Sequence, residues 1–166
     1  MNLDLIPRRI LAIFAHPDDE TFLAGGTLAT YAARGCEVFL LCATHGESGP
    51  HGDYEDLSSS EFAALRQREL EGACRALGIR SPLFLECADR GLAHDCWDSA
   101  RDEIVRLIRT VRPDVVITFG PDGISGHPDH VALNKIVTAA GFFHSVRRGR
   151  GPPVTAGDSH GRNALG

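Results

Sequence analysis

Long hydrophobic runs and runs of basic residues are both missing from this 166-residue sequence. No apolar stretch approaches the ~18 residues that a transmembrane helix needs, and the one behind the first few residues is too short for a signal peptide. The formal net charge is -5, which disfavours binding to nucleic acid or to a membrane surface. With 43% hydrophobic and 23% charged residues, the chain is expected to form one globular domain.

Paired cysteine motifs are absent as well. The five cysteines, Cys36, Cys42, Cys74, Cys87 and Cys96, form no Cys-x-x-Cys pair. An odd number of cysteines without a secretory segment predicts reduced thiols and a cytoplasmic protein. The first three fall within apolar patterns and are expected in the core.

Four short apolar runs alternate with helical patterns. We expect strands at 10–15, 38–43, 83–86 and 115–119, and helices at 20–34, 58–77, 99–111 and 128–143. Three of the runs lack polar alternation, which is typical of strands buried on both faces of a parallel sheet. The order predicts an α/β fold, a Rossmann-like three-layer sandwich with strand order 3-2-1-4 and helices on both faces.

Local signals mark the ends of two of these helices. Ser58 and Glu61 have the spacing of a capping box, and Gly78 is expected to end the same helix. Ser99 and Asp102 suggest a similar start for the third helix.

The last twenty residues have a different composition. Residues 147–166 are rich in Gly, Pro and Arg and carry almost no large apolar side chain, so they cannot bury a core. We therefore divide the chain into a folded domain over residues 1–146 and a mobile tail over residues 147–166.

Two polar clusters follow the first and fourth predicted strands. The first strand ends in His-Pro-Asp-Asp-Glu (16–20), and the fourth is followed by His-Pro-Asp-His (127–130). Open α/β sheets bind ligands at the carboxyl ends of their strands, and the order 3-2-1-4 makes strands one and four neighbours. The two clusters are therefore expected to meet at one pocket.

The residues in these clusters suit a metal ion. His16 and Asp19 are three residues apart, as are His127 and His130, and two imidazoles with one carboxylate and an open position form a common catalytic zinc site. The alternative is that the acids only favour a helix N-terminus and that the second cluster is only a turn. A dinucleotide site is disfavoured because no Gly-x-Gly-x-x-Gly follows the first strand.

The Ala-His-Pro-Asp-Asp-Glu and His-Pro-Asp-His motifs, in this order and spacing, resemble those of the LmbE-like superfamily. This superfamily includes the N-acetylglucosaminyl-phosphatidylinositol de-N-acetylases (PIG-L) and deacetylases of bacterial thiol biosynthesis. The resemblance covers about residues 8–143 and extends to Gly25-Gly26-Thr27, Thr44-x-Gly46-Glu47-x-Gly49 and Asp89-Arg90-Gly91-Leu92. It implies a zinc-dependent hydrolase that removes an acetyl group from a small molecule containing N-acetylglucosamine.

The resemblance also implies roles for individual residues. The ligands of one zinc ion per chain would be His16, Asp19 and His130. Asp18 would be the general base, His127 would stabilise the oxyanion or protonate the leaving amine, and Asp129 would orient a histidine. Such roles fit the chemistry, because an amide is a poor electrophile and needs activation by a metal, a base and a hydrogen-bond donor.

Two further residues are candidates for substrate binding. Arg66 interrupts the apolar stripe of the predicted helix 58–77; the resemblance implies a substrate contact, and the alternative is an arginine that extends from the helix to solvent. Asp89 would bind sugar hydroxyls, or would only form a turn before Arg-Gly. Glu47 suits either a pocket wall or a solvated loop.

The chain departs from the family pattern at its C-terminal end, where members usually continue with at least one more strand. The metal site needs only residues that are present, so we expect intact metal chemistry but weaker substrate binding than in longer members. A sheet that ends at strand four leaves an open edge, which favours association, for example as a homo-oligomer. Two other functions therefore stay open: an inactive metal-binding fragment that associates through this edge, and a Mg²⁺-dependent nucleotide-binding domain, although imidazoles favour a softer metal.

Overall fold

The computed structural model describes residues 6–147 of the chain. Its elements are β1 (Arg9–Phe14), α1 (Asp19–Ala33), β2 (Glu37–Cys42), the short 3-10 helix η2 (Gly52–Tyr54), α2 (Ser59–Leu77), β3 (Leu83–Phe84), α3 (Trp97–Val111), β4 (Val115–Ile117) and α4 (Pro128–Arg147). Helix α4 ends later than predicted, at Arg147. The rest of the predicted tail lies outside the described residues.

The four strands form one parallel sheet in the order β3-β2-β1-β4, as predicted. Strand β1 pairs with β2 along its whole length and with β4 over Ile10–Ala12. The two outer strands are shorter than predicted, at two and three residues. The buried apolar residues continue beyond these ladders, since Leu85 after β3 and Phe119 after β4 are only 4% and 2% exposed.

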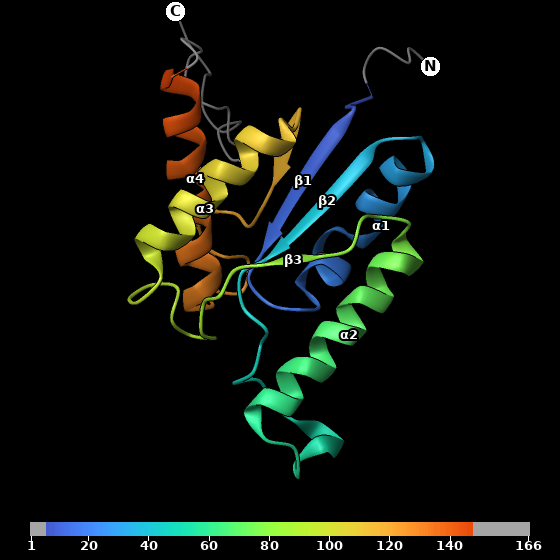
Figure 1. Cartoon of the computed structure of the whole chain (residues 1–166), viewed down its shortest axis with the longest axis vertical. Coiled ribbons are helices and arrows are strands. Elements are labelled where there is room, and N and C mark those ends of the chain that lie inside the picture. The colour runs from blue at the N-terminus through green and yellow to red at the C-terminus, as the bar shows by residue number, and fades with distance from the viewer. Residues whose placement is uncertain (1–5, 148–166) are drawn as a thin grey trace, which may run out of the picture.

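Helices cover both faces of the sheet. Figure 1 shows α1 and α2 on one side and α3 and α4 on the other, with β1 and β2 between them. Leu11, Ala12 and Ile13 of β1 have no exposed surface, which explains why this strand reads as a continuous apolar run. Each large side chain buried there contributes about 1.5–3 kcal/mol to stability.

Both predicted ends are confirmed for α2, whereas for α3 the end at Val111 is confirmed and the start at Ser99 is wrong. Ser58 and Glu61 form the complete capping box, and Gly78 ends α2 in the left-handed region at φ 71°. Helix α3 begins at Trp97 instead, and the Ser99 hydroxyl donates to the Cys96 carbonyl at 3.2 Å. The sequence shows a serine–acid spacing in both helices, but the chain turns into α3 two residues earlier.

One prediction about the cysteines is wrong. Cys36, Cys42 and Cys74 are buried and free, as expected, but Cys87 and Cys96 form a disulfide with their Cα atoms 5.8 Å apart. The intervening turns, which no cysteine motif marks, bring the two residues together. The cytoplasmic prediction loses the support that it drew from reduced thiols.

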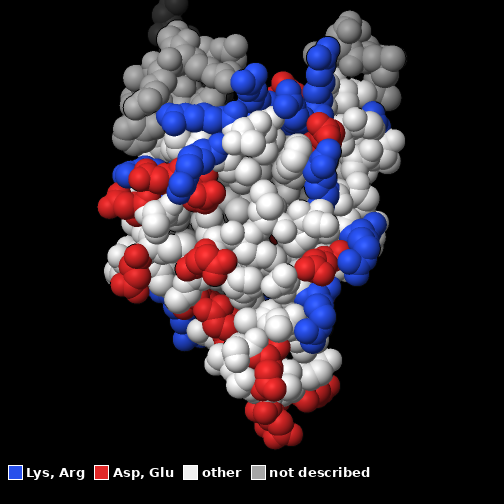
Figure 2. All heavy atoms as spheres, in the orientation of Figure 1, with Lys and Arg blue, Asp and Glu red and all other residues white. Residues whose placement is uncertain are grey.

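The charged surface residues are unevenly distributed. Figure 2 shows acidic side chains over the tip formed by η2 and the start of α2, where Asp53, Glu55, Asp56 and Glu61 are exposed. Basic side chains gather at the opposite end, near the start of β1. The carboxyl ends of the strands point toward the acidic end. Among the described residues, no helix is both long enough and apolar enough to cross a bilayer.

Candidate active site

The two predicted clusters meet where β1 and β4 end. His16 follows β1, while His127 and His130 stand at the start of α4. The centroid of the His16 ring lies 4.9 Å from that of His127 and 5.2 Å from that of His130. Residues distant in the sequence thus form one site because β1 and β4 are neighbours in the sheet.

Two imidazole nitrogens and both oxygens of one carboxylate meet in this site, and the three residues that carry them, His16, Asp19 and His130, are here called the donor triangle. His16 Nδ1 lies 3.2 Å from His130 Nε2 and 3.5 Å from Asp19 Oδ2, while Asp19 Oδ1 lies 3.4 Å from His130 Nε2. Donors at zinc distances of 2.0–2.1 Å in a tetrahedral arrangement are about 3.4 Å apart. The separations among these side chains are of the size that zinc requires, with a different Asp19 oxygen facing each histidine, and their role as ligands stays a prediction.

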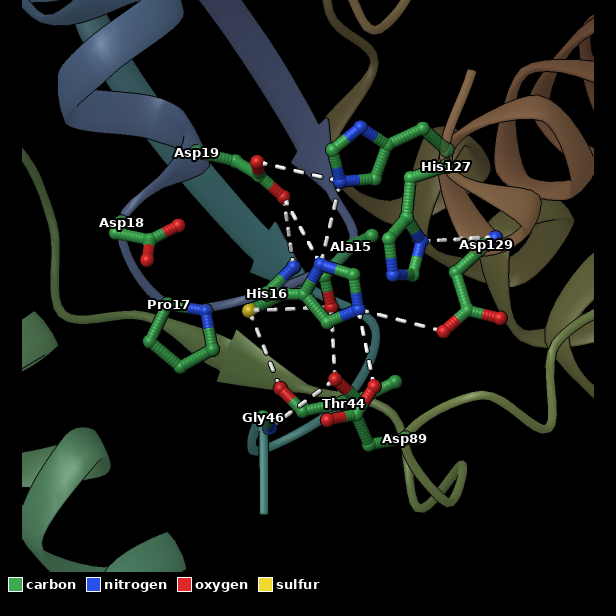
Figure 3. Close-up of polar contacts among 12 residues, drawn as sticks. Ala15, His16, Pro17, Asp18, Asp19, Thr44, Gly46, Asp89, His127 and Asp129 are labelled. Carbon is green, nitrogen blue, oxygen red and sulfur yellow. Dashed lines mark hydrogen bonds and ion pairs between the residues drawn. The ribbon is translucent and has the colours of Figure 1, made fainter. Parts of the chain in front are cut away.

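The outer nitrogens of the two histidines have acceptors of their own. His16 Nε2 lies 3.1 Å from Asp89 Oδ1 and 3.3 Å from Asp129 Oδ2; Figure 3 shows both carboxylates on this side of the ring and Asp19 on the other. His130 Nδ1 lies 3.1 Å from the Gly123 carbonyl oxygen. Such partners fix ring orientation and direct the opposite nitrogen toward a metal.

Other residues near His16 also bring possible ligand atoms close together. Two groups have ligand atoms within 4.8 Å of one another, His16 with His127 and His130, and His16 with Asp89 and Asp129. His127 Nδ1 already accepts the Asp129 backbone N–H at 3.2 Å, and the two carboxylates face the outer nitrogen of His16. Asp129 thus lies where it can orient His16, and Asp19 as the third ligand stays a prediction.

The electrostatic environment favours a cation at this position. Burial lowers the pKa of His16, but hydrogen bonds to three carboxylates, that of Asp129 foremost, outweigh it and raise the pKa to about 11. Burial raises the pKa of Asp19, but hydrogen bonds to His130 and His16 bring it well below its usual range. Without a metal, a proton on His16 balances the acidic residues around it.

This balance predicts how the stability of the metal-free protein depends on pH. The folded-state pKa of His16, about 11, exceeds the ordinary value of 6.5, so the contribution of the protonated ring is complete below pH 6.5 and is lost as the pH rises to about 11. We expect the free energy of unfolding of EDTA-treated protein to fall over this range. In denaturant titrations at several pH values, the free energy of unfolding of the His16→Gln variant should fall less than that of wild type. The His94→Gln variant, changed at an exposed position, should behave as wild type.

Asp18 has an unusual backbone conformation beside the donor triangle. Its φ of 117° costs about 1–3 kcal/mol for a residue other than glycine. The Glu20 carboxylate, which is only 1% exposed, accepts the Asp18 backbone N–H at 3.1 Å. Glu20 thus stabilises this turn, a role that the sequence did not reveal because the residue looked like one more acid at a helix start.

Arg66 connects three segments around the site. It lies 2.8 Å from Asp18 Oδ2, and it donates to the carbonyl oxygens of Gly46, at 3.0 Å, and of Pro17. Its side chain is 16% exposed, so it does not extend into solvent. The guanidinium orients Asp18, and its predicted contact with a substrate stays a prediction.

Burial and charge act in opposite directions on Asp18 and also affect His127. Burial raises the pKa of the Asp18 carboxyl, while the positive charge of Arg66 opposes that shift. Burial lowers the pKa of His127, and the charges of His16 and His130 lower it further. His127 is therefore neutral at pH 7, and since its Nδ1 accepts a hydrogen bond, its Nε2 carries the proton.

A cavity of about 260 Å³ opens beside Asp18. Its lining comes from the turn after β1, the first turns of α1 and one face of α2, namely Pro17, Asp18, Glu20, Thr21, Phe22, Arg66, Glu69, Leu70 and Ala73. Phe22 is largely exposed at this position. The cavity therefore lies next to the predicted base, and none of the residues of the donor triangle lines it.

The contact between Gly46 and Arg66 predicts opposite effects for two substitutions. A Cβ atom at Gly46, which has a φ of 68°, would overlap the Arg66 guanidinium, so Gly46→Ala should lose about 1–3 kcal/mol from the backbone conformation alone. Gly26 lies in α1 with nothing within 4 Å of an added Cβ atom, so Gly26→Ala should gain about 0.5–1 kcal/mol. Urea titrations of both variants test this; an unchanged midpoint for Gly46→Ala would contradict the tight approach of Arg66.

The sequence is similar to a known protein family and to curated proteins. The PIG-L model, described as GlcNAc-PI de-N-acetylase, matches residues 11–141. A 1D-myo-inositol 2-acetamido-2-deoxy-alpha-D-glucopyranoside deacetylase from Rhodococcus opacus is 40% identical over 154 residues, which cover 80% of this chain and 53% of the relative. The chain thus spans about half the length of the curated relatives that it matches.

Two solved structures illustrate the likeness. The N,N'-diacetylchitobiose deacetylase from Pyrococcus horikoshii is 30% identical with a TM-score of 0.74, and the match covers 84% of this chain and 51% of that one. The 4-carboxy-2-hydroxymuconate hydratase GalB from Pseudomonas putida also has a TM-score of 0.74, at 21% identity, over 89% of this chain and 61% of that one. The latter shows the fold alone, and since folds host different reactions, function is argued from the site. Because the family model matches most of the described chain, the protein belongs to the PIG-L family of GlcNAc-PI de-N-acetylases.

Proposed function

We propose that this chain is a zinc-dependent N-deacetylase that removes the acetyl group from a small molecule containing N-acetylglucosamine. The observation that carries the proposal is the donor triangle of His16, Asp19 and His130, with its 3.2–3.5 Å separations. The relatives named as deacetylases of GlcNAc-containing compounds support the substrate class. A Mg²⁺ site is disfavoured because two of the three donors are imidazole nitrogens.

The residues around the donor triangle have separate roles in the proposed reaction. When bound, zinc supplies a Lewis acid that polarises the amide carbonyl and lowers the pKa of water. Asp18 accepts the proton of the attacking water, and Arg66, 2.8 Å away, keeps its carboxylate in place. His127 donates its Nε2 proton to the oxygen on which negative charge develops, or to the leaving amine.

The surroundings of the site suit a neutral amino sugar. On the face shown in Figure 2, the charged side chains toward the tip, where the carboxyl ends of the strands point, are mostly acidic, which would repel phosphate-rich ligands. The Arg66 guanidinium already donates to the Gly46 and Pro17 carbonyl oxygens and to the Asp18 carboxylate, so it is less available to a phosphate group. We infer that Asp18 and Arg66 lie at the edge of the sugar site, beside the cavity that both residues line.

Acetate release measured together with metal content tests the proposal. The full chain, purified under mild conditions and loaded with zinc, should release acetate from the GlcNAc–inositol conjugate or from N,N'-diacetylchitobiose, whereas protein treated with a chelator should not. Stoichiometric zinc without acetate release from either compound would instead support the alternative of an inactive metal-binding fragment.

A further inference from the structure

The loop between β3 and α3 packs against the candidate site, and a disulfide joins the two ends of this loop. Cys87 and Cys96 are nine residues apart, and the segment between them, residues 87–96, is here called the disulfide loop. Neither cysteine has a role in the proposed chemistry. Cys87 is 5% exposed, and Cys96 is half-buried beside the exposed residues 93–95.

Both carboxylates behind His16 depend on this loop. Asp89 belongs to the loop and places Oδ1 3.1 Å from His16 Nε2. The Arg90 backbone N–H donates to Asp129 Oδ2 at 2.8 Å, and the same oxygen lies 3.3 Å from His16 Nε2. The position of the loop therefore determines the hydrogen bonding of the predicted ligand His16.

Mostly polar contacts hold the loop in this position. The Glu47 carboxylate accepts the Asp89 backbone N–H at 2.8 Å, and Asp89 Oδ2 accepts the Ser48 backbone N–H at 2.9 Å. Leu92 is fully buried and anchors the middle of the loop. Arg90 also has a positive φ of 69°, a conformation that few residues other than glycine adopt readily. The disulfide between the loop ends favours this conformation because it limits the number of alternative conformations of the loop.

We propose that the Cys87–Cys96 disulfide is a redox-sensitive positioning element, whose reduction by a dithiol loosens the disulfide loop and weakens the hold of Asp89 and Asp129 on His16. A thiolate of the reductant attacks the Cys96 sulfur, which borders the exposed residues. The S–S bond breaks, and Cys87 leaves as a thiolate that takes up a proton. The second thiol of the reductant then displaces Cys96, so the reductant ends as a disulfide and the protein as two thiols.

Hydrogen exchange on the metal-free protein tests the positioning directly. Alkylation first establishes the redox state, with three free thiols in the oxidised chain and five in the reduced one. We expect the backbone amides of Ser48, Asp89 and Arg90 to exchange at least about 10-fold faster after treatment with dithiothreitol, as they would if they open more readily. Amides in β1 should not change. Equal exchange in both states would show that Leu92 and the hydrogen bonds suffice, and would overturn the proposal.

Zinc affinity provides a second readout, which rests on the ligand set proposed above. Dithiols bind zinc themselves, so the comparison uses a Cys87→Ser/Cys96→Ser variant without reductant. It should bind zinc roughly 10- to 100-fold more weakly than the oxidised wild type, the usual effect of losing an outer hydrogen-bond partner. Cys36→Ala, at a buried free cysteine away from the loop, should bind as wild type.

The two readouts separate the two proposals. Faster exchange with unchanged zinc affinity would show that the disulfide only stabilises the loop, and would overturn its role in positioning His16. If the oxidised wild type binds no zinc, the ligand set is wrong. In that case the exchange rate of the Arg90 amide, which donates to Asp129, still shows whether reduction of the disulfide loosens the loop.

Discussion

Replacing Asp18 with asparagine is expected to lower the rate of acetate release by on the order of 10²–10⁴-fold, the usual contribution of a general base, while zinc stays bound. Asparagine has nearly the same shape as aspartate but cannot accept a proton from water. The three proposed zinc donors are untouched, and the backbone N–H of residue 18 can still donate to Glu20. Turnover and bound zinc should be measured on the same sample.

A matched substitution controls for the loss of one negative charge. Asp53→Asn removes a carboxylate from the exposed η2 and should leave both turnover and zinc content unchanged. If Asp18→Asn instead lost zinc and recovered its rate when zinc was added back, Asp18 would be a ligand and the base would lie elsewhere.

Replacing His130 with alanine is expected to abolish stoichiometric zinc binding and to reduce acetate release to the level of chelated enzyme. The substitution removes one corner of the donor triangle, and the two remaining donors cannot complete a zinc site with three protein ligands. His16→Ala should have the same effect. Zinc content after dialysis, with binding titrations by calorimetry, is the measurement.

Loss of folding must be separated from loss of the ligand. The His130 ring stacks on Phe119 with 4.0 Å between ring centroids, so His130→Ala also removes a core contact, and its thermal unfolding should be recorded. His94→Ala, at an exposed position, is the control and should keep its zinc. A folded His130→Ala variant with full zinc occupancy would remove His130 from the ligand set.

Much of the fold could be predicted because it depends on local patterns. The apolar run of β1 and the capping box at Ser58 involve residues close together in the sequence, whose spacing reflects the geometry of a strand or a helix turn. The strand order followed from the alternation of strands and helices, since parallel connections are almost always right-handed. That order placed His16 and His130 at adjacent strand ends, and the structure confirms that they lie together.

The contacts that complete the site depend on the tertiary structure. Nothing near Asp89 in the sequence indicates that its carboxylate lies against His16, nor that Arg66 bonds to the turn at Asp18. The Cys87–Cys96 disulfide likewise forms because two turns bring the loop ends together. The sequence by itself thus determined the strand order and the placement of the two motifs at neighbouring strand ends, through short-range periodicity and the handedness of the connections. Which carboxylate supports which histidine was decided only when loops from different strand ends packed together, because side-chain direction there follows from individual backbone angles, such as the φ of 117° at Asp18, that no repeating pattern encodes.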